Sequence, residues 1–151
     1  MLDQCKRSVG VYFIINAMFL GIDYGKKRIG LALGEKFPKP FLVLENNSLN
    51  EMVEKIAQVC SENQVDKIIV GMPENRGQNS EDLISDIKKF ATELSNNVPL
   101  EIVYEPEAYT STEAETLLKD HKKYDRNDKG KVDAMAATLL LEQYINKRGE
   151  E

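Results

Sequence analysis

Carboxylates are the most numerous side chains in this sequence that could carry out chemistry. The 151 residues include 25 Asp and Glu but a single histidine, His121, and two well-separated cysteines, Cys5 and Cys60. One histidine and two such cysteines cannot build the usual four-ligand zinc site. They also supply no disulfide framework, which indicates a reducing, cytoplasmic environment. If the protein is an enzyme, we expect carboxylates or backbone groups to do the chemistry.

Asp23 is the first acid in an unusual place. It lies near the end of an apolar segment, residues 19–24, in phase with Phe19 and Gly21, and this segment is typical of a strand. Aspartate is disfavoured in strands, and burial of its charge is costly unless the carboxylate is paired or bound to a metal ion. The alternative is a turn aspartate whose side chain bonds the backbone of Gly25.

Glu107 is the second such acid. It follows a predicted strand, residues 100–104, and precedes a helix start at Thr110. Functional sites of α/β sheets gather at the carboxyl ends of the strands. Glu105 is a close competitor, however, and acids at strand ends are common on solvated surfaces, so that spacing alone favours an ordinary surface residue.

Asp133 is the third acid, in the first turn of the predicted last helix. The helix dipole favours an aspartate in that turn, which is the usual explanation for one. Asp133 nevertheless shares a helix face with Ala136, Ala137 and Leu140. Because that face is the packed one, a solvated charge is not expected there.

A strand, a strand end and a helix start could bring these three acids to one site. Hard oxygen ligands without imidazole suit Mg²⁺ or Mn²⁺. Two such ions, about 3.5–4 Å apart, can activate a water and stabilise the leaving oxygen in phosphodiester hydrolysis. Asp23, Glu107 and Asp133 are therefore candidate catalytic residues and metal ligands.

The elements that must position these acids follow from hydrophobic period and capping signals. We expect strands at residues 19–24, 29–33, 41–44, 67–70 and 100–104, and helices from Ser48 to 62, from Ser80 through 94, from Thr110 to 119 and over 131–146. Three strands joined by short turns, followed by alternating helices and strands, predict a mixed α/β sheet. In this sheet an antiparallel meander leads into two parallel strands, with helices on its faces.

The length suggests one domain. The formal net charge of -5 argues against a general nucleic-acid binder, whose affinity is usually electrostatic. Residues 1–17 are an N-terminal extension, either a product of an upstream start codon or an addition to the first strand, and residues 18–151 are the domain. The apolar stretch over residues 9–22 is too short to span a bilayer.

Four motifs resemble the YqgF family, described as pre-16S rRNA nucleases or Holliday junction resolvases. They are residues 20–32 (LGIDYGKKRIGLA), 70–73 (VGMP) with Gly77, 110–115 (TSTEAE) and 131–137 (KVDAMAA). The resemblance covers residues 18–144 and implies an RNase H-like fold with five strands. The acids of the family carry over to Asp23, Glu107 and Asp133. Where the family often has Asp-Glu-Arg, this chain has Pro106-Glu107-Ala108, which puts substrate affinity or catalytic efficiency in doubt but not the metal site.

Further residues are candidates for substrate binding, each with a simpler alternative. They are Lys26, Lys27 and Arg28 in a hairpin turn, Gly71, Met72 and Pro73 at a strand end, Thr110 and Ser111 at a helix start, and Lys122, Lys123, Arg126 and Lys129 in a lysine-rich loop. The basic residues could hold phosphates, and a helix N-terminus can do so too. A solvated turn, a strand stop, a helix cap and a solvated loop explain the same residues without a ligand.

We therefore expect a cytoplasmic, metal-dependent nuclease without a membrane segment, with Mg²⁺ or Mn²⁺ as cofactor. The resemblance implies that it processes the 5′ end of pre-16S rRNA, in contact with ribosomal precursor particles. The alternatives are a Holliday junction resolvase acting on branched DNA and a non-catalytic RNase H-like module that binds nucleic acid. A monomer and a homodimer are both open. Divalent ions would offset the negative charge of the three acids. The negative net charge is therefore a weaker argument against nucleic-acid binding than it first appears.

Overall fold

The structure is a computed structural model, and it describes residues 17–107 and 129–149. Five strands and three helices follow each other there as β1 (Phe19–Tyr24), β2 (Arg28–Gly34), β3 (Lys39–Glu45), α3 (Leu49–Glu62), β4 (Lys67–Met72), α4 (Gln78–Asn97), β5 (Glu101–Pro106) and α6 (Lys129–Gly149). The strands form one sheet in the order β3-β2-β1-β4-β5. β1, β2 and β3 pair antiparallel, whereas β1–β4 and β4–β5 pair parallel. The predicted fold class is confirmed.

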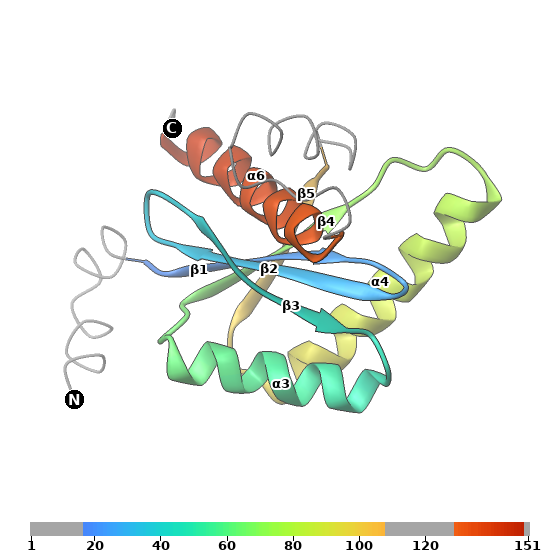
Figure 1. Cartoon of the computed structure of the whole chain (residues 1–151), viewed down its shortest axis with the longest axis horizontal. Helices are drawn as coiled ribbons and strands as arrows, with labels where there is room; N and C mark the ends of the chain where they lie inside the picture. Colours follow the sequence, from blue (N-terminus) through green and yellow to red (C-terminus); the bar gives the residue numbers. More distant parts are fainter. Residues whose placement is uncertain (1–16, 108–128, 150–151) are drawn as a thin grey trace.

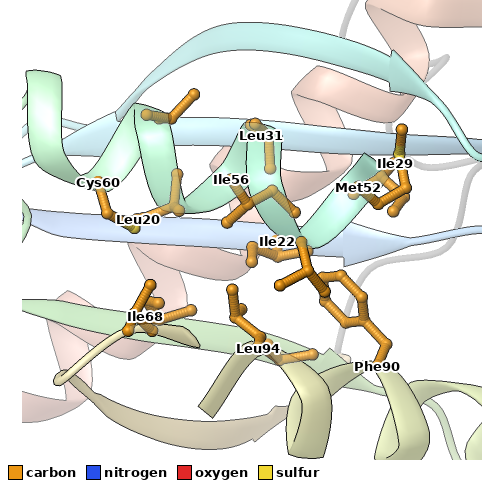
Figure 2. Packing of buried hydrophobic residues seen from close by; sticks show 14 of the residues in the cluster. Leu20, Ile22, Ile29, Leu31, Met52, Ile56, Cys60, Ile68, Phe90 and Leu94 are labelled. Carbon is orange, nitrogen blue, oxygen red and sulfur yellow. The ribbon is translucent and has the colours of Figure 1, made fainter. Parts of the chain in front are cut away.

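The sheet separates two layers of helices. Figure 1 shows α3 and α4 on one face and α6 across the other. The larger core lies on the face covered by α3 and α4, where Leu20 and Ile22 of β1 pack among Met52 and Ile56 of α3 and Phe90 of α4 (Figure 2). These side chains are fully buried, and truncation of one such side chain to alanine typically costs about 2–5 kcal/mol.

A smaller core lies on the face that α6 covers. Phe19, Ala32 and Ile69 of three neighbouring strands contact Ala137 and Leu141 of the helix. Because side chains alternate along a strand, the residues of β1 that face α6 are the odd-numbered ones. This alternation decides which residues can reach the candidate site.

The start of α3 is as predicted, but the start of α4 is not. Ser48 caps α3, where its Oγ accepts a hydrogen bond of 3.2 Å from the backbone N–H of Glu51. The prediction that Ser80 caps the next helix is wrong, because α4 begins at Gln78 and its N-cap is Gly77. Gly77 has a φ of 122°, a conformation that glycine adopts far more readily than other residues.

Two further boundaries differ from prediction and matter for the acids. β5 continues to Pro106, which is tolerated because β5 is an edge strand and needs no further N–H donor there. α6 begins at Lys129 rather than at residue 131, with Gly130 accommodated in its first turn. Asp133 therefore lies beyond the first turn, and the explanation by the helix dipole does not account for it.

Several predictions lie outside the described residues. They are the N-terminal extension up to residue 16, the helix behind Thr110, and the side chains of Ser111, Lys122, Lys123 and Arg126. Within residues 17–107 and 129–149, no helix is long and apolar enough to cross a membrane.

Candidate active site

Asp23 lies at the carboxyl end of β1 on the face covered by α6. The series Phe19, Gly21, Asp23 points to that face, while Leu20 and Ile22 point into the larger core. The side chain of Asp23 shares a hydrogen bond with the side chain of Glu107. In the part of the chain that the structure describes, no hydrogen bond joins the Asp23 carboxylate to the backbone N–H of Gly25, and the Gly25 carbonyl accepts a hydrogen bond of 2.9 Å from Asn46. Asp23 is thus a site candidate and not merely a turn residue.

Glu107 continues the alternation of β5, and its backbone is fixed at the end of β4. Its N–H donates a hydrogen bond of 3.0 Å to the carbonyl of Met72. Glu105, the competing acid, is buried on the same face but is already engaged. Its carboxylate accepts a 2.7 Å hydrogen bond from Lys147 and a further one from Gln143, both on α6. Of the two acids, the one that reaches Asp23 is Glu107.

Three glycines make room for the convergence of strands and helix. A Cβ at Gly30, the β2 residue paired with Asp23, would lie 2.2 Å from the backbone carbonyl oxygen of Asp133. A Cβ at Gly21 would lie 3.1 Å from the carbonyl oxygen of Ala137. A Cβ at Gly71 would lie 2.8 Å from Oε1 of Glu107. Gly71 therefore accommodates the Glu107 side chain, a role that its place at a strand end did not suggest.

Asp133 is brought to the same region but pairs with an arginine. Its Oδ2 accepts a 2.7 Å hydrogen bond from Nε of Arg28, the first residue of β2. Both side chains keep some solvent contact, with exposed fractions of 34% for Arg28 and 23% for Asp133. The sequence did not predict this ion pair, which gives Arg28 a positioning contact within the protein beside the phosphate-binding role expected of it.

The electrostatics of the three acids are unfavourable in the absence of a cation. Burial raises the pKa of Asp23 well above its ordinary value, and the hydrogen bond with Glu107 and the charges of Glu107 and Asp133 raise it further. Like charges that share a site disfavour ionisation in this way. A partly buried carboxyl with a raised pKa and charged partners is also a frequent mark of a functional site.

The donor set suits a hard divalent cation, although its members are not in a ligating arrangement. Among the described residues, no group of three or more His, Cys, Asp or Glu side chains is placed so as to hold a metal ion. Asp133 is turned to Arg28, which leaves Asp23 and Glu107 as the pair in direct contact. Carboxylate oxygens are the ligands that Mg²⁺ and Mn²⁺ prefer.

The remaining predicted residues lie around this end of the sheet where they are described. Lys26 and Lys27 are exposed in the turn after Asp23. Gly71 and Met72 end β4, and Pro73 follows them. Lys129 is the first residue of α6, while Thr110, Ser111, Lys122, Lys123 and Arg126 lie outside the described residues.

Comparison with known proteins identifies the family to which this chain belongs. Residues 17–147 match the family described as "RuvX: Holliday junction resolvase". The chain belongs to the RuvX family. RuvX is another name for the YqgF family, which the four sequence motifs resemble. The resemblance is therefore confirmed.

RuvX relatives cover nearly the whole domain. A protein of Crocosphaera subtropica is 36% identical over 132 residues, which are 85% of this chain and 92% of the relative. A protein of Shewanella denitrificans is 31% identical over 137 residues, which are 89% of this chain and 97% of the relative. Both are named "Putative pre-16S rRNA nuclease". The prediction that this RuvX chain is a nuclease is confirmed.

Solved structures confirm the fold at low identity. The chain superposes on RuvC of Thermus thermophilus in complex with a Holliday junction substrate with a TM-score of 0.62 and 13% identity, covering 89% of this chain and 97% of that one. It superposes on the fowlpox virus resolvase, in complex with junction DNA, with a TM-score of 0.56 and 11% identity, covering 87% and 98%. Nucleases of this fold family typically use divalent metal ions.

Proposed function

We propose that this RuvX protein is a metal-dependent nuclease that hydrolyses a phosphodiester bond near the 5′ end of the precursor of 16S ribosomal RNA. The observation that carries the proposal is the hydrogen-bonded pair of carboxyl groups of Asp23 and Glu107 at the ends of β1 and β5. Their mutual repulsion, together with the charge of Asp133, would be relieved by cations bound at this place.

The three acids would together hold two ions of Mg²⁺ or Mn²⁺. Asp23 and Glu107 would be the central ligands, and Asp133 would complete the set. When bound, such ions supply an activated water and neutralise charge on the phosphate. Asp23 must lose its proton to ligate, and its raised pKa therefore makes loading dependent on pH. Arg28 holds Asp133 near the other two acids through their 2.7 Å contact, and this contact would have to open before the Asp133 carboxylate binds an ion.

Substrate contacts are proposed for the groups around the acids. Lys26 and Lys27 stand exposed beside Asp23 and would hold backbone phosphates as point charges. The backbone of Gly71, Met72 and Pro73 lies at the end of β4, next to Glu107, where a strand of nucleic acid could approach closely. From the sequence we add Thr110 and Ser111 and the basic residues Lys122, Lys123, Arg126 and Lys129.

Ribosomal RNA is favoured over DNA by the names of the relatives at 36% and 31% identity. The description of the family favours the second candidate, resolution of a Holliday junction, which needs two active sites and hence a homodimer. A non-catalytic binding module is the third reading, motivated by Pro106 and Ala108 where the family often has Asp and Arg. Retention of all three acids argues against it.

The test incubates the purified full-length chain with labelled pre-16S rRNA, an unrelated single-stranded RNA and a four-way DNA junction. Each substrate is offered with Mg²⁺, with Mn²⁺ and with a chelator. We expect metal-dependent cleavage of the pre-rRNA near its 5′ end. Cleavage of the junction alone would replace the proposed substrate by the second candidate, and binding without turnover on every substrate would favour the non-catalytic module.

A further inference from the structure

A polar pocket lies on the α6 side of the sheet and extends from Lys67 at the start of β4 to Glu105 near the end of β5. It has a volume of about 430 Å³ and is lined by Lys67, Glu105, Tyr144, Lys147 and Arg148. Asp133 and Arg148 are 15 residues apart on α6, which corresponds to about 22 Å at 1.5 Å per residue. The basic residues of the pocket, at the start of β4 and the C-terminal end of α6, are therefore distant from Asp133, whereas Glu105 is two residues from Glu107 on the same face of the sheet.

The pocket carries an excess of positive charge. Lys147 contacts the buried carboxylate of Glu105 at 2.7 Å, and Lys67 faces the exposed carboxylate of Glu101 at 3.5 Å. Within the described parts of the chain, Arg148 belongs to no ion pair. Three cations thus face two carboxylates in a protein whose formal net charge is -5. A singly charged anion such as a phosphodiester would balance this excess.

Among the described residues, the contacts of Arg148 are with aromatic rings. Its guanidinium lies 5.4 Å from the ring centre of Phe19 and 5.8 Å from that of Tyr144, and it donates a 3.2 Å hydrogen bond to the Tyr144 hydroxyl. The Lys67 ammonium lies 5.5 Å from the same Tyr144 ring. A guanidinium fixed in this way loses little side-chain entropy when it binds, and its geometry matches a phosphate group.

An exposed aromatic residue lies at the same end of the sheet. Phe37, in the turn between β2 and β3, is 82% exposed, and the neighbouring Lys36 and Lys39 are exposed as well. Pairing of Gly34 with Phe19 brings this turn to the start of β1, and Figure 1 shows the turn and the C-terminal end of α6 at the same end of the molecule. An exposed ring between cations is typical of a platform on which an unpaired base stacks.

We infer that this end of the molecule is a second contact for a single-stranded segment of the substrate, in which Lys67, Lys147 and Arg148 bind a backbone phosphate and Phe37 stacks on a base. That the ligand is nucleic acid rests on the proposed function. The separation of about 22 Å between Asp133 and Arg148 along α6 corresponds to about six stacked nucleotides at about 3.4 Å each. The contact would hold the strand on one side of the cleaved bond and would leave the chemistry unchanged.

The test measures binding without cleavage. Fluorescence anisotropy in the presence of chelator gives the dissociation constant of a labelled 16-nucleotide single-stranded RNA over a range of salt concentrations. The full-length chain is compared with Lys67→Gln, Arg148→Gln, Arg148→Lys and Phe37→Ala. Lys88→Gln is the matched control, because Lys88 is an exposed lysine of α4 on the other face of the sheet. Thermal unfolding of each variant verifies that it is folded.

Each removed charge should weaken binding about fivefold at 0.1 M salt and reduce the slope of log K against log salt by about 0.7. Arg148→Lys should keep the slope, because it keeps the charge. Phe37→Ala should weaken binding at least about fivefold without any change of slope, because stacking releases no counterions. A duplex of the same length should bind more weakly than the single strand and should be insensitive to Phe37→Ala.

The phosphate contact would be overturned if Arg148→Gln and Lys67→Gln bound with wild-type affinity and slope. It would also be overturned if they lost no more affinity than Lys88→Gln. Wild-type affinity in Phe37→Ala, or equal binding of the duplex, would overturn the stacking contact. Since every measurement is made with chelator, a chain that never cleaves can still support the inference. A chain that cleaves normally while these variants bind normally would leave the proposed function intact and remove the second contact.

Discussion

Nε of Arg28 lies 2.7 Å from Oδ2 of Asp133 and so joins the start of β2 to the second turn of α6. The two residues are 105 positions apart in the sequence. Gly30 allows this contact, since a side chain there would collide with the backbone of Asp133. The ion pair holds the third acid beside Asp23 and Glu107 but directs its carboxylate to a cation that the protein itself provides. If Asp133 ligates a divalent ion as proposed, Arg28 and that ion compete for its carboxylate.

Replacement of Arg28 should separate its effect on the stability of the protein from its effect on metal binding. Arg28→Gln leaves the charge of Asp133 uncompensated, so we expect a metal-free protein that is less stable by up to about 1 kcal/mol, the range for partly exposed ion pairs. Removal of the competing cation should also tighten binding of Mn²⁺ several-fold in isothermal titration. Lys55→Gln, an exposed lysine on α3, is the control. Weaker metal binding in Arg28→Gln would instead mean that the arginine holds Asp133 in its ligating position.

Asp23 should lower the stability of the metal-free protein as the pH rises. Its folded-state pKa is raised above the ordinary value of 3.8, so the favourable contribution of its proton is complete below that pH and is lost as pH rises through the folded pKa. Asp23→Asn removes this loss and should raise the melting temperature in chelator at neutral pH by a few degrees, and less at pH 4. An Asn variant that melts below the wild type at pH 7 would contradict the assigned electrostatics.

Gly71 should be required for the placement of Glu107 rather than for folding. In Gly71→Ala the new methyl group would lie 2.8 Å from the end of a flexible side chain, which can move aside. We expect a folded protein whose melting temperature changes by only a few degrees and whose cleavage rate falls at least about tenfold. Gly30→Ala is the contrasting variant, because its methyl group would meet backbone at 2.2 Å and should destabilise the whole domain. Full activity in Gly71→Ala would show that Glu107 tolerates displacement.

Cys60 should be unreactive in the folded protein. Burial in the larger core raises the pKa of its thiol from 9.0 to about 11. In a Cys5→Ser background, reaction with a thiol reagent at pH 8 should be about a hundredfold slower in the native state than in guanidinium, because the thiolate is the reactive form. The same shift stabilises the fold below about pH 9, and this stabilisation is lost as pH rises towards 11. Equal rates in the two states would mean that the core opens readily.

Much of the fold could be predicted because local signals and global order agree. The alternation of β1 and β2, the continuous apolar run of β4 and the Ser48 cap each point to the same sheet. The misplaced boundaries have local causes that compete with those signals. Gly77 starts α4 through a positive φ, Pro106 is accepted because β5 is an edge strand, and Gly130 is accepted near a helix start.

The site was only partly predictable. Asp23 stood out because a charge in an apolar strand requires a reason. The alternation of β5 places Glu105 and Glu107 on the same face, so periodicity could not choose between them, and only the resemblance to the YqgF family favoured Glu107. The choice follows from Lys147, 42 residues away, which occupies Glu105. The Arg28–Asp133 pair also depends on tertiary contact alone, although glycines at alternate positions of apolar strands were a usable sign of close packing.

The most direct test of the central claim is the rate at which labelled pre-16S rRNA is cleaved by wild type, Asp23→Asn and Asp82→Asn, in Mg²⁺ and in chelator. Asp82 is an exposed aspartate of α4 and serves as the matched control. We predict cleavage by the wild type and by Asp82→Asn only with Mg²⁺, and a loss of at least about a thousandfold in Asp23→Asn with its fold intact. Cleavage by Asp23→Asn at the wild-type rate, or cleavage by the wild type in chelator, would contradict a carboxylate-held metal site.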